Sequence, residues 1–209
     1  MLNKRNLEVV KFAPVKESRY TYNNILVGPE GTVATDGHML AIVSLPENDP
    51  AAFPVKDGLN FKAGKGWKPF MLAANTVKGL MKAIPKVKGA FQEKLGVIAI
   101  DPEQTDGNGN AVMAVTDLNS STVLNPPKVD GQFPNYDTVM PKPEDATATI
   151  SFNAEFMAEL CKLAAQFEGR NHTVTLRLYG PDRVMRLDAK DPHTGQTFVG
   201  LLMSLRPKS

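Results

Sequence analysis

Apolar and polar positions alternate along several segments of the chain, a pattern typical of half-buried β-strands. Residues 19–45 carry such alternation on both sides of turn signals at Gly28 and Gly31, which predicts a hairpin or meander. Residues 46–69 are rich in Pro, Gly, Asp and Lys, and they predict a long surface connection with one short strand near residues 59–61. The N-terminal part of the chain is therefore expected to form sheet.

The period of the pattern changes between Ala73 and Pro85. Apolar side chains recur there at the spacing of one helix face, namely Val77, Leu80, Met81 and Ile84. Asn75 is a candidate cap for the start of this helix. Three strands are expected to follow the helix, at residues 96–100, 111–116 and 121–124.

The same order recurs near the C-terminus. A strand over 147–152 leads through Asn153, a good N-cap, into a helix that ends at Gly169. Strands follow at 172–179, 183–189 and 197–205. The sequence thus contains an internal repeat of strand, helix and three strands, and residues 19–45 fit a third repeat whose helix is missing or reduced to a remnant in KRNLEVVKFA. These repeats predict an α+β fold with helices packed on antiparallel sheets.

The composition indicates the class of protein but not its function. The chain has 209 residues, 42% hydrophobic and 22% charged, which suits a globular protein of one large or two small domains. The net charge is only +2, so binding of nucleic acid would require local clusters of basic residues. Cys161 is the single cysteine and is expected to be a buried thiol. The absence of a disulfide, signal peptide or apolar span favours the cytoplasm and excludes membrane partners.

One such basic cluster lies on the predicted helix after Ala73. Four lysines follow its polar side at or near a four-residue spacing: Lys78, Lys82, Lys86 and Lys88. Like charges at this spacing repel by ~0.2–0.5 kcal/mol per pair, and a polyanion would relieve that repulsion. These lysines are therefore candidate DNA-binding residues, and the alternative interpretation is an ordinary solvated lysine face.

An enzymatic function is not expected. Asp36 and His38 lie on one face of a strand, and His172 and His193 are the other histidines, but no Ser or Cys nucleophile motif accompanies them. The chain has no metal-binding, phosphate-binding or dinucleotide-binding motif, so no metal or cofactor is expected either.

Three blocks of the sequence resemble the bacterial DNA polymerase III beta subunit, the sliding clamp. SRYTYNNILVGPEGTVATDGHMLAIVSLP resembles the family's middle domain, where an RY-x-LNG strand precedes ATDGHRLA. VDGQFPNYDTVMP resembles the FPxY-x-x-V-x-P segment between the middle and last domains, and FVGLLMSLRP resembles the closing YVVMPMR strand. The blocks occur in the family's order.

The resemblance implies a DNA-clamp-like fold. Residues 1–140 are expected to correspond to the middle domain with a reduced first helix, and residues 141–209 to a half domain, the C-terminal unit of the last domain. Both could also pack as one compact body. Family members have three domains, and two molecules close a ring around duplex DNA. This chain has about half that length, so the first domain and one unit of the last are expected to be missing.

In the family, the three blocks converge on a hydrophobic groove that receives short peptides from polymerases, the clamp loader and repair proteins. Carried over position by position, the groove residues implied here are Tyr22, Thr35, Gly37, His38, Met39, Leu40, Pro134, Asp137, Thr138, Val139, Leu201, Leu202, Met203, Ser204, Leu205 and Arg206. Methionines give deformable apolar walls, and glycine allows close approach of a partner's backbone. The alternative interpretation is that the apolar members are ordinary core residues.

Three functions follow from these residues. The first is a clamp-like, non-catalytic accessory subunit that oligomerises, binds clamp-binding peptides of replication or repair proteins and tethers them to duplex DNA. The second is a stand-alone peptide-binding regulator or decoy that does not encircle DNA. The third is an accessory protein that binds DNA through the lysine face alone.

Overall fold

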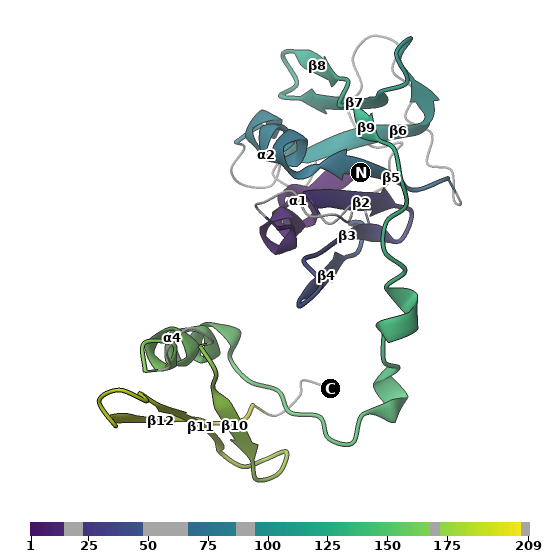
Figure 1. Ribbon diagram of the computed structural model, residues 1–209. Helices are drawn as coiled ribbons and strands as arrows, with labels where there is room; N and C mark the ends of the chain where they lie inside the picture. The colour runs from purple at the N-terminus through teal and green to yellow at the C-terminus, as the bar shows by residue number, and fades with distance from the viewer. Residues whose placement is uncertain (15–22, 48–66, 87–94, 168–171, 206–209) are drawn as a thin grey trace. The chain divides into compact units, whose positions relative to one another are not determined.

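A computed structural model describes residues 1–14, 23–47, 67–86, 95–167 and 172–205 (Figure 1). The chain forms two compact units, Met1–Tyr136 and Asp137–Ser209. The short strand expected near residues 59–61 lies outside the described residues. The helix expected to end at Gly169 ends earlier, at Ala164 with Ala165 as its C-cap, so that prediction was wrong.

The first unit contains two repeats of strand, helix and three strands. The first repeat consists of β1 (Leu2–Asn3), α1 (Lys4–Glu8) with the 3-10 turn η1 (Val9–Phe12), β2 (Asn24–Gly28), β3 (Gly31–Thr35) and β4 (Leu40–Val43). The second consists of β5 (Phe70–Ala73), α2 (Ala74–Ala83), β6 (Val97–Thr105), β7 (Ala111–Thr116) and β8 (Ser121–Leu124). The remnant helix expected in KRNLEVVKFA is thus present.

Local sequence explains where the two helices begin. Asn3 and Asn6 form a reciprocal capping box, in which each side chain accepts a hydrogen bond from the other's backbone N–H at 3.2 and 3.0 Å. This cap nucleates a helix of only five residues. The N-cap of α2 is Ala73 and has no side-chain hydrogen bond, so the prediction that Asn75 caps this helix was wrong.

The two repeats are joined by exchanged strands. β1 of the first repeat pairs with β6 of the second, and β5 of the second pairs with β2 of the first, both antiparallel. The resulting sheets have the orders β1-β6-β7-β8 and β4-β3-β2-β5-β9, where β9 is Lys128–Val129. The repeat at 70–124 therefore completes its domain with residues 1–45.

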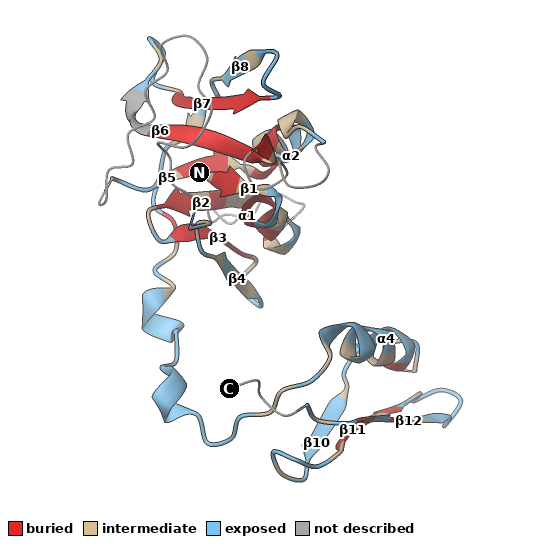
Figure 2. Cartoon of the chain, turned by 180° about the vertical axis from the view of Figure 1, so that it is seen from behind, coloured by how far each residue is buried: buried red, intermediate tan, exposed pale blue. Residues whose placement is uncertain are grey.

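The core of the first unit lies between its helices and its two sheets. Leu7 of α1 and Val77 and Leu80 of α2 are buried in one cluster with Ile25 and Ile98 from the two sheets. The helices contact each other and lie side by side (Figure 1). Figure 2 shows the buried strands of both sheets at the centre of this unit.

The second unit contains a single repeat. Two 3-10 turns, η5 (Asp137–Val139) and η6 (Pro143–Asp145), precede α4 (Ala154–Ala164), which is followed by β10 (Thr175–Leu178), β11 (Met185–Lys190) and β12 (Thr197–Leu202) in one antiparallel sheet. Asn153 caps α4 as expected, because its side chain accepts hydrogen bonds from the N–H groups of Glu155 and Phe156 at 2.9 and 3.2 Å. The strand expected over 147–152 was wrong, since only a single bridge forms there, between Ser151 and Leu205.

The core of this second unit is small. Met185 and Leu187 of β11 and Leu202 of β12 are buried, and Ala164 of α4 is the buried residue of the helix. α4 lies close over β12, since a Cβ at Gly200 would approach Leu160 to 3.1 Å. Cys161 is exposed, so the expectation of a buried thiol was wrong.

Candidate functional site

A tight turn between β3 and β4 carries the TDGHML block. The Thr35 hydroxyl accepts a hydrogen bond from the Gly37 N–H at 3.1 Å and donates one to the Met39 carbonyl at 2.6 Å. Oδ1 of Asp36 accepts the N–H groups of His38 and Met39 at 2.8 and 2.7 Å. Gly37 has φ +89°, a conformation that favours glycine. The turn is therefore held by side chains that belong to it.

This hydrogen bonding also favours the charged form of the Asp36 carboxyl. The Met39 N–H, and then the His38 N–H, lower the pKa of the Asp36 carboxyl below its usual value. Asp36 is thus a carboxylate at neutral pH. Its role is to fix the backbone of residues 36–39, while the side chains of His38 and Met39 remain exposed, Met39 by 51%.

An aspartate also holds the turn between the last two strands of each of the other two repeats. Between β7 and β8, Oδ1 of Asp117 accepts the N–H groups of Asn119 and Ser120 at 3.0 and 2.7 Å. Between β11 and β12, Oδ1 of Asp191 accepts those of His193 and Thr194 at 2.7 and 3.2 Å. The aspartate is consequently a structural element of every repeat. What distinguishes the first repeat is the sequence of its exposed tip, residues 37–39.

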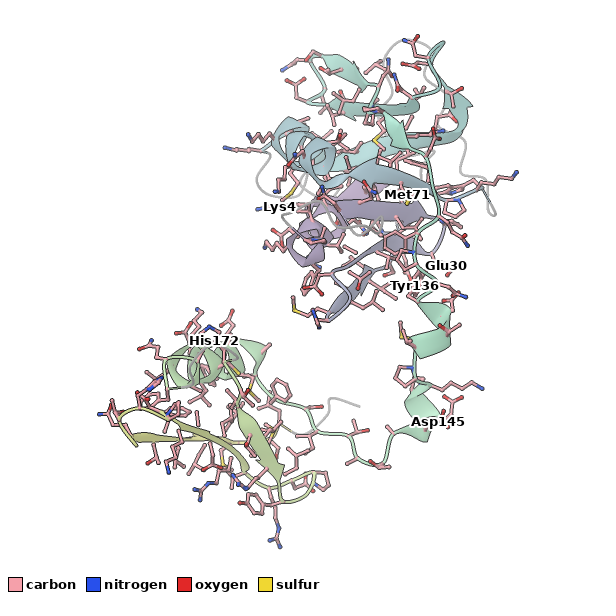
Figure 3. All side chains as sticks on the ribbon, in the orientation of Figure 1. Lys4, Glu30, Met71, Tyr136, Asp145 and His172 are labelled. Carbon is pink, nitrogen blue, oxygen red and sulfur yellow. The ribbon has the colours of Figure 1, made fainter. Side chains whose placement is uncertain are left out.

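The FPNY block packs against the sheet that carries this turn. Phe133 is buried with Val33 and Met71, and Leu40 and Tyr136 pack against that cluster. The rings of Phe133 and Tyr136 meet edge to face, with centroids 6.3 Å apart. Figure 3 labels Met71 and Tyr136 in this cluster. Two of the three blocks are therefore brought together in the first unit, and Pro134, half-buried, is held between the two aromatic anchors.

Phe133 and Tyr136 were missing from the sequence-based list of groove residues. The apolar and polar pattern around the prolines gave no indication of which surface Phe133 and Tyr136 contact. Their aromatic character in FPNY was the only signal that the sequence offered. They act as anchors for the segment that leads to residues 137–139.

Most of the remaining candidates lie in the second unit. Asp137, Thr138 and Val139 form η5, and the Val139 side chain is 73% exposed. At the end of the chain, exposed apolar side chains occupy alternate positions, Leu201, Met203 and Leu205, at 62%, 66% and 49% exposure. Ser204 is partly buried and Leu202 lies in the core, 6% exposed. Tyr22 and Arg206 lie outside the described residues.

The lysine row is shorter on the helix than expected. α2 ends at Ala83, so Lys78 and Lys82 are exposed on the helix, Lys86 is exposed beyond it, and Lys88 lies outside the described residues. Sequence reasoning missed a second basic element beside α2. α1 and η1 contact α2 and carry three further exposed basic residues, Lys4, Arg5 and Lys11. Glu8 forms ion pairs with Lys4 and Lys11 at 3.8 and 3.5 Å. The basic residues of the KRNLEVVK segment were the feature of the sequence that could have indicated this second group of basic side chains.

The histidines are explained by local structure. His38 and His193 lie in the aspartate turns, and His172 Nδ1 is 2.9 Å from the carbonyl oxygen of Ala165. Within the described ranges, no group of three His, Cys, Asp or Glu side chains is arranged to hold a metal ion. No helix in the described part of the chain is long and apolar enough to cross a membrane.

Comparisons of the sequence identify no relative, because no protein-family model and no curated protein matches the chain. Comparison of the fold finds solved structures with a similar fold. A DNA polymerase sliding clamp from Pseudomonas aeruginosa superposes with a TM-score of 0.60 at 15% identity, covering 97% of this chain and 50% of that one. A DNA polymerase III beta chain from Streptococcus pneumoniae gives 0.60 at 17% identity, covering 98% and 48%, and the Helicobacter pylori beta clamp gives 0.58 at 13%, covering 99% and 48%.

The chain spans about half the length of the clamps it matches. The superposition covers nearly the whole chain, so it includes the two repeats of the first unit and the helix and three strands of the second. The chain has the α+β fold of the bacterial DNA polymerase III beta sliding clamps.

Proposed function

We propose that this protein is a non-catalytic, sliding-clamp-like factor that binds clamp-binding peptides of DNA polymerases or repair proteins and tethers them to duplex DNA. One observation carries the proposal. Four apolar side chains on the three segments that the resemblance assigns to the groove are each more than half exposed: Met39, Val139, Leu201 and Met203. Exposed apolar side chains of this size favour burial by a partner.

The chemistry of these side chains suits a short apolar peptide. Met39 and Met203 are unbranched and polarisable, so they adapt to different apolar side chains. Gly37 at the tip of the turn allows a peptide backbone to approach closely. Such sites typically bind a few anchor residues of the peptide, and we expect the exposed members of the groove set to contact them.

The helices α1 and α2 support the DNA part of the proposal. Their exposed basic side chains Lys4, Arg5, Lys78 and Lys82 gather on two adjacent helices, together with Lys11 and Lys86 beside them. A row of lysines and arginines can contact phosphates without reading bases, as a protein that slides along DNA requires. This surface favours a DNA tether over a regulator that binds peptides alone.

Fluorescence polarisation with a labelled clamp-binding peptide from a bacterial DNA polymerase III tests the peptide site. Met203→Asp places a charge at a 66% exposed apolar position, and we expect at least about a tenfold loss of affinity. Val123→Asp is the matched control, because Val123 is 47% exposed on β8, outside the three blocks. Equal affinity of both variants and wild type would overturn the proposed site.

Retention on circular DNA tests the tether. The protein is loaded on nicked circular duplex DNA, which is then linearised. A tethering clamp remains on the circle at moderate salt and is lost from the linear form. A protein that dissociates equally from both forms does not encircle DNA, and only the peptide-binding part of the proposal would then stand.

A further inference from the structure

The first unit shows how two repeats complete one domain. In each repeat, the residue that precedes the helix cap is an apolar residue on a short strand, Leu2 before Asn3 and Leu72 before Ala73. Leu2 pairs with Ile98 and Leu72 pairs with Ile25, and all four residues are fully buried. The short strand of each repeat thus covers the first long strand of the other.

The register of this exchange is the same in both directions. The cap residue lies opposite the first residue of the long strand, Asn3 opposite Val97 and Ala73 opposite Asn24. The residue before the cap lies opposite the second residue of that strand. The position of the helix cap and the first residue of the long strand therefore define the register of the pairing in both directions.

The second unit has both halves of this exchange but only one repeat. Asn153 is the cap of α4, Phe152 precedes it, and β10 begins at Thr175 and Leu176. β10 is an edge strand of its sheet. Phe152 is 40% exposed and Leu176 46%, whereas the four residues at the corresponding positions of the first unit are fully buried.

The exposed side chains of β10 include two on the inner face of the sheet. Leu176 lies opposite Leu187 and Leu178 lies opposite Met185, and both of these partners on β11 are 1% exposed. Cross-strand partners share a face, so Leu176 and Leu178 belong to the core side, yet Leu178 is 49% exposed. On α4, Phe156 is 61% exposed. The core of this unit is thus uncovered along one side.

The segment before α4 already has one of its two expected neighbours. In the first unit, β5 pairs with β2 on one edge and with β9 on the other, where Met71 lies opposite Val129. In the second unit, Ser151 stands two residues before the cap, as Met71 does, and pairs with Leu205. The described residues thus supply the equivalent of β9, and the edge that would meet a β2 equivalent has no strand partner among them.

We propose that the second units of two molecules complete each other as a two-fold pair. The segment 150–153 of each molecule adds to the edge of β10 in the other, antiparallel, in the register found twice in the first unit: Asn153 opposite Thr175, Phe152 opposite Leu176, Ser151 opposite Arg177 and Ile150 opposite Leu178. Apolar residues then meet apolar residues on the core side.

Charge and symmetry favour a second molecule of this chain as the occupant. Residues 147–152, TATISF, contain no charged residue, so the added strand brings no like charge beside Arg177. In the described part of each molecule, one short segment and one strand edge lack a strand partner, and a two-fold interface satisfies both at once. The strand predicted over 147–152 from the sequence would then form in the dimer. This inference does not depend on the peptide site.

Cysteine cross-linking tests the register. In a Cys161→Ser background, which removes the exposed native thiol, one chain carries Phe152→Cys and another carries Leu176→Cys. Mixing the two under mild oxidation should give a disulfide-linked dimer. The matched control replaces Leu176→Cys by Arg177→Cys, whose side chain points to the opposite face of the sheet, and should give none. Equal cross-linking in both mixtures, or in neither, would overturn the proposed pairing.

Light scattering after size-exclusion chromatography tests the association itself. The wild-type chain should have twice its mass of 22.7 kDa, and the double variant Leu176→Glu with Leu178→Glu should have the single mass. Circular dichroism checks that the variant remains folded, as expected for positions that are half exposed in one molecule. If the wild-type chain is monomeric at the highest soluble concentration, the proposal is wrong. That result includes the case in which another part of the same chain covers β10.

Discussion

The hydroxyl of Thr35 donates a hydrogen bond to the carbonyl oxygen of Met39 at 2.6 Å, across the turn that joins β3 to β4. Because Asp36 holds the N–H group of Met39 at the same time, the backbone of this residue is fixed on both sides while its side chain stays exposed. The turn thus presents an apolar side chain on a rigid support. Such preorganisation lowers the ordering cost when a partner binds.

Removing the support should weaken peptide binding more than it weakens the fold. Asp36→Ala deletes the acceptor for the N–H groups of His38 and Met39. We expect about a fivefold loss of peptide affinity, since a loosened turn must be ordered on binding at ~1 kcal/mol. Asp117→Ala makes the same change in the equivalent turn of the second repeat and should leave affinity unchanged. If both variants bind alike in fluorescence polarisation, the turn at residue 36 is not part of the site.

Because of the aspartate turns, we expect the free energy of unfolding to fall in acid. In the Asp117 turn the N–H of Ser120, followed by that of Asn119, lowers the pKa of the carboxyl below its usual value. A carboxyl with a lowered folded pKa stabilises the fold above its unfolded pKa of ~3.9, and this contribution is lost as the pH falls through the lower folded value.

Urea unfolding between neutral pH and pH ~2.5, below the ordinary aspartate pKa, measures this effect. Asp117→Asn keeps an acceptor oxygen but cannot titrate, so its unfolding free energy should decline less in acid than that of the wild type. Parallel curves for the two proteins would show that the turn carboxylate does not couple to stability.

Two glycines should respond to alanine in opposite directions. Gly31 has φ +144°, and a Cβ there would lie 2.2 Å from the Val43 carbonyl oxygen. Gly31→Ala should therefore destabilise the first unit by about 2–4 kcal/mol. Gly79 lies on α2, and a Cβ there would meet nothing within 4 Å, so Gly79→Ala should stabilise by ~0.5–1 kcal/mol. Unfolding curves that shift in the same direction for both variants would contradict the described backbone.

The basic helix surface should control the salt dependence of DNA binding. Lys78→Glu combined with Lys82→Glu should weaken binding and lower the slope of log affinity against log salt by about two, at ~0.9 per lost phosphate contact. Lys162→Glu with Lys190→Glu changes the net charge equally on α4 and β11 and should have a much smaller effect. Titration of a fluorescent duplex at several salt concentrations distinguishes the two double variants. An equal loss in both would mean that only net charge matters.

Elements with a clear local period could be predicted from the sequence. The spacing of Val77, Leu80 and Met81 predicted α2, and Asn153 predicted the start of α4. α1 has only five residues, too few for a helical period to emerge, and the capping box of Asn3 and Asn6 forms it instead. Local patterns with good caps therefore carried most of the correct assignments.

Features that depend on distant partners could not be predicted in the same way. The segment 147–152 has strand-like residues, but a strand requires a neighbouring edge, and only Ser151 finds one. For the candidate site, the blocks predicted Met39 and Met203, whose side chains are exposed. The basic residues of α1 were missed because they reach α2 only through the pairing of residues far apart in the chain.

The pairing of Leu2 with Ile98 has a consequence for how the protein is made. The first strand of the chain cannot find its neighbour until the ribosome has added nearly one hundred further residues. At ordinary translation speeds this delay is ~5–20 s, long compared with the formation of a helix or hairpin. During that time the nascent first repeat lacks the neighbours that bury Leu7, Ile25 and Val27 in the folded unit, so these apolar side chains stay in contact with solvent.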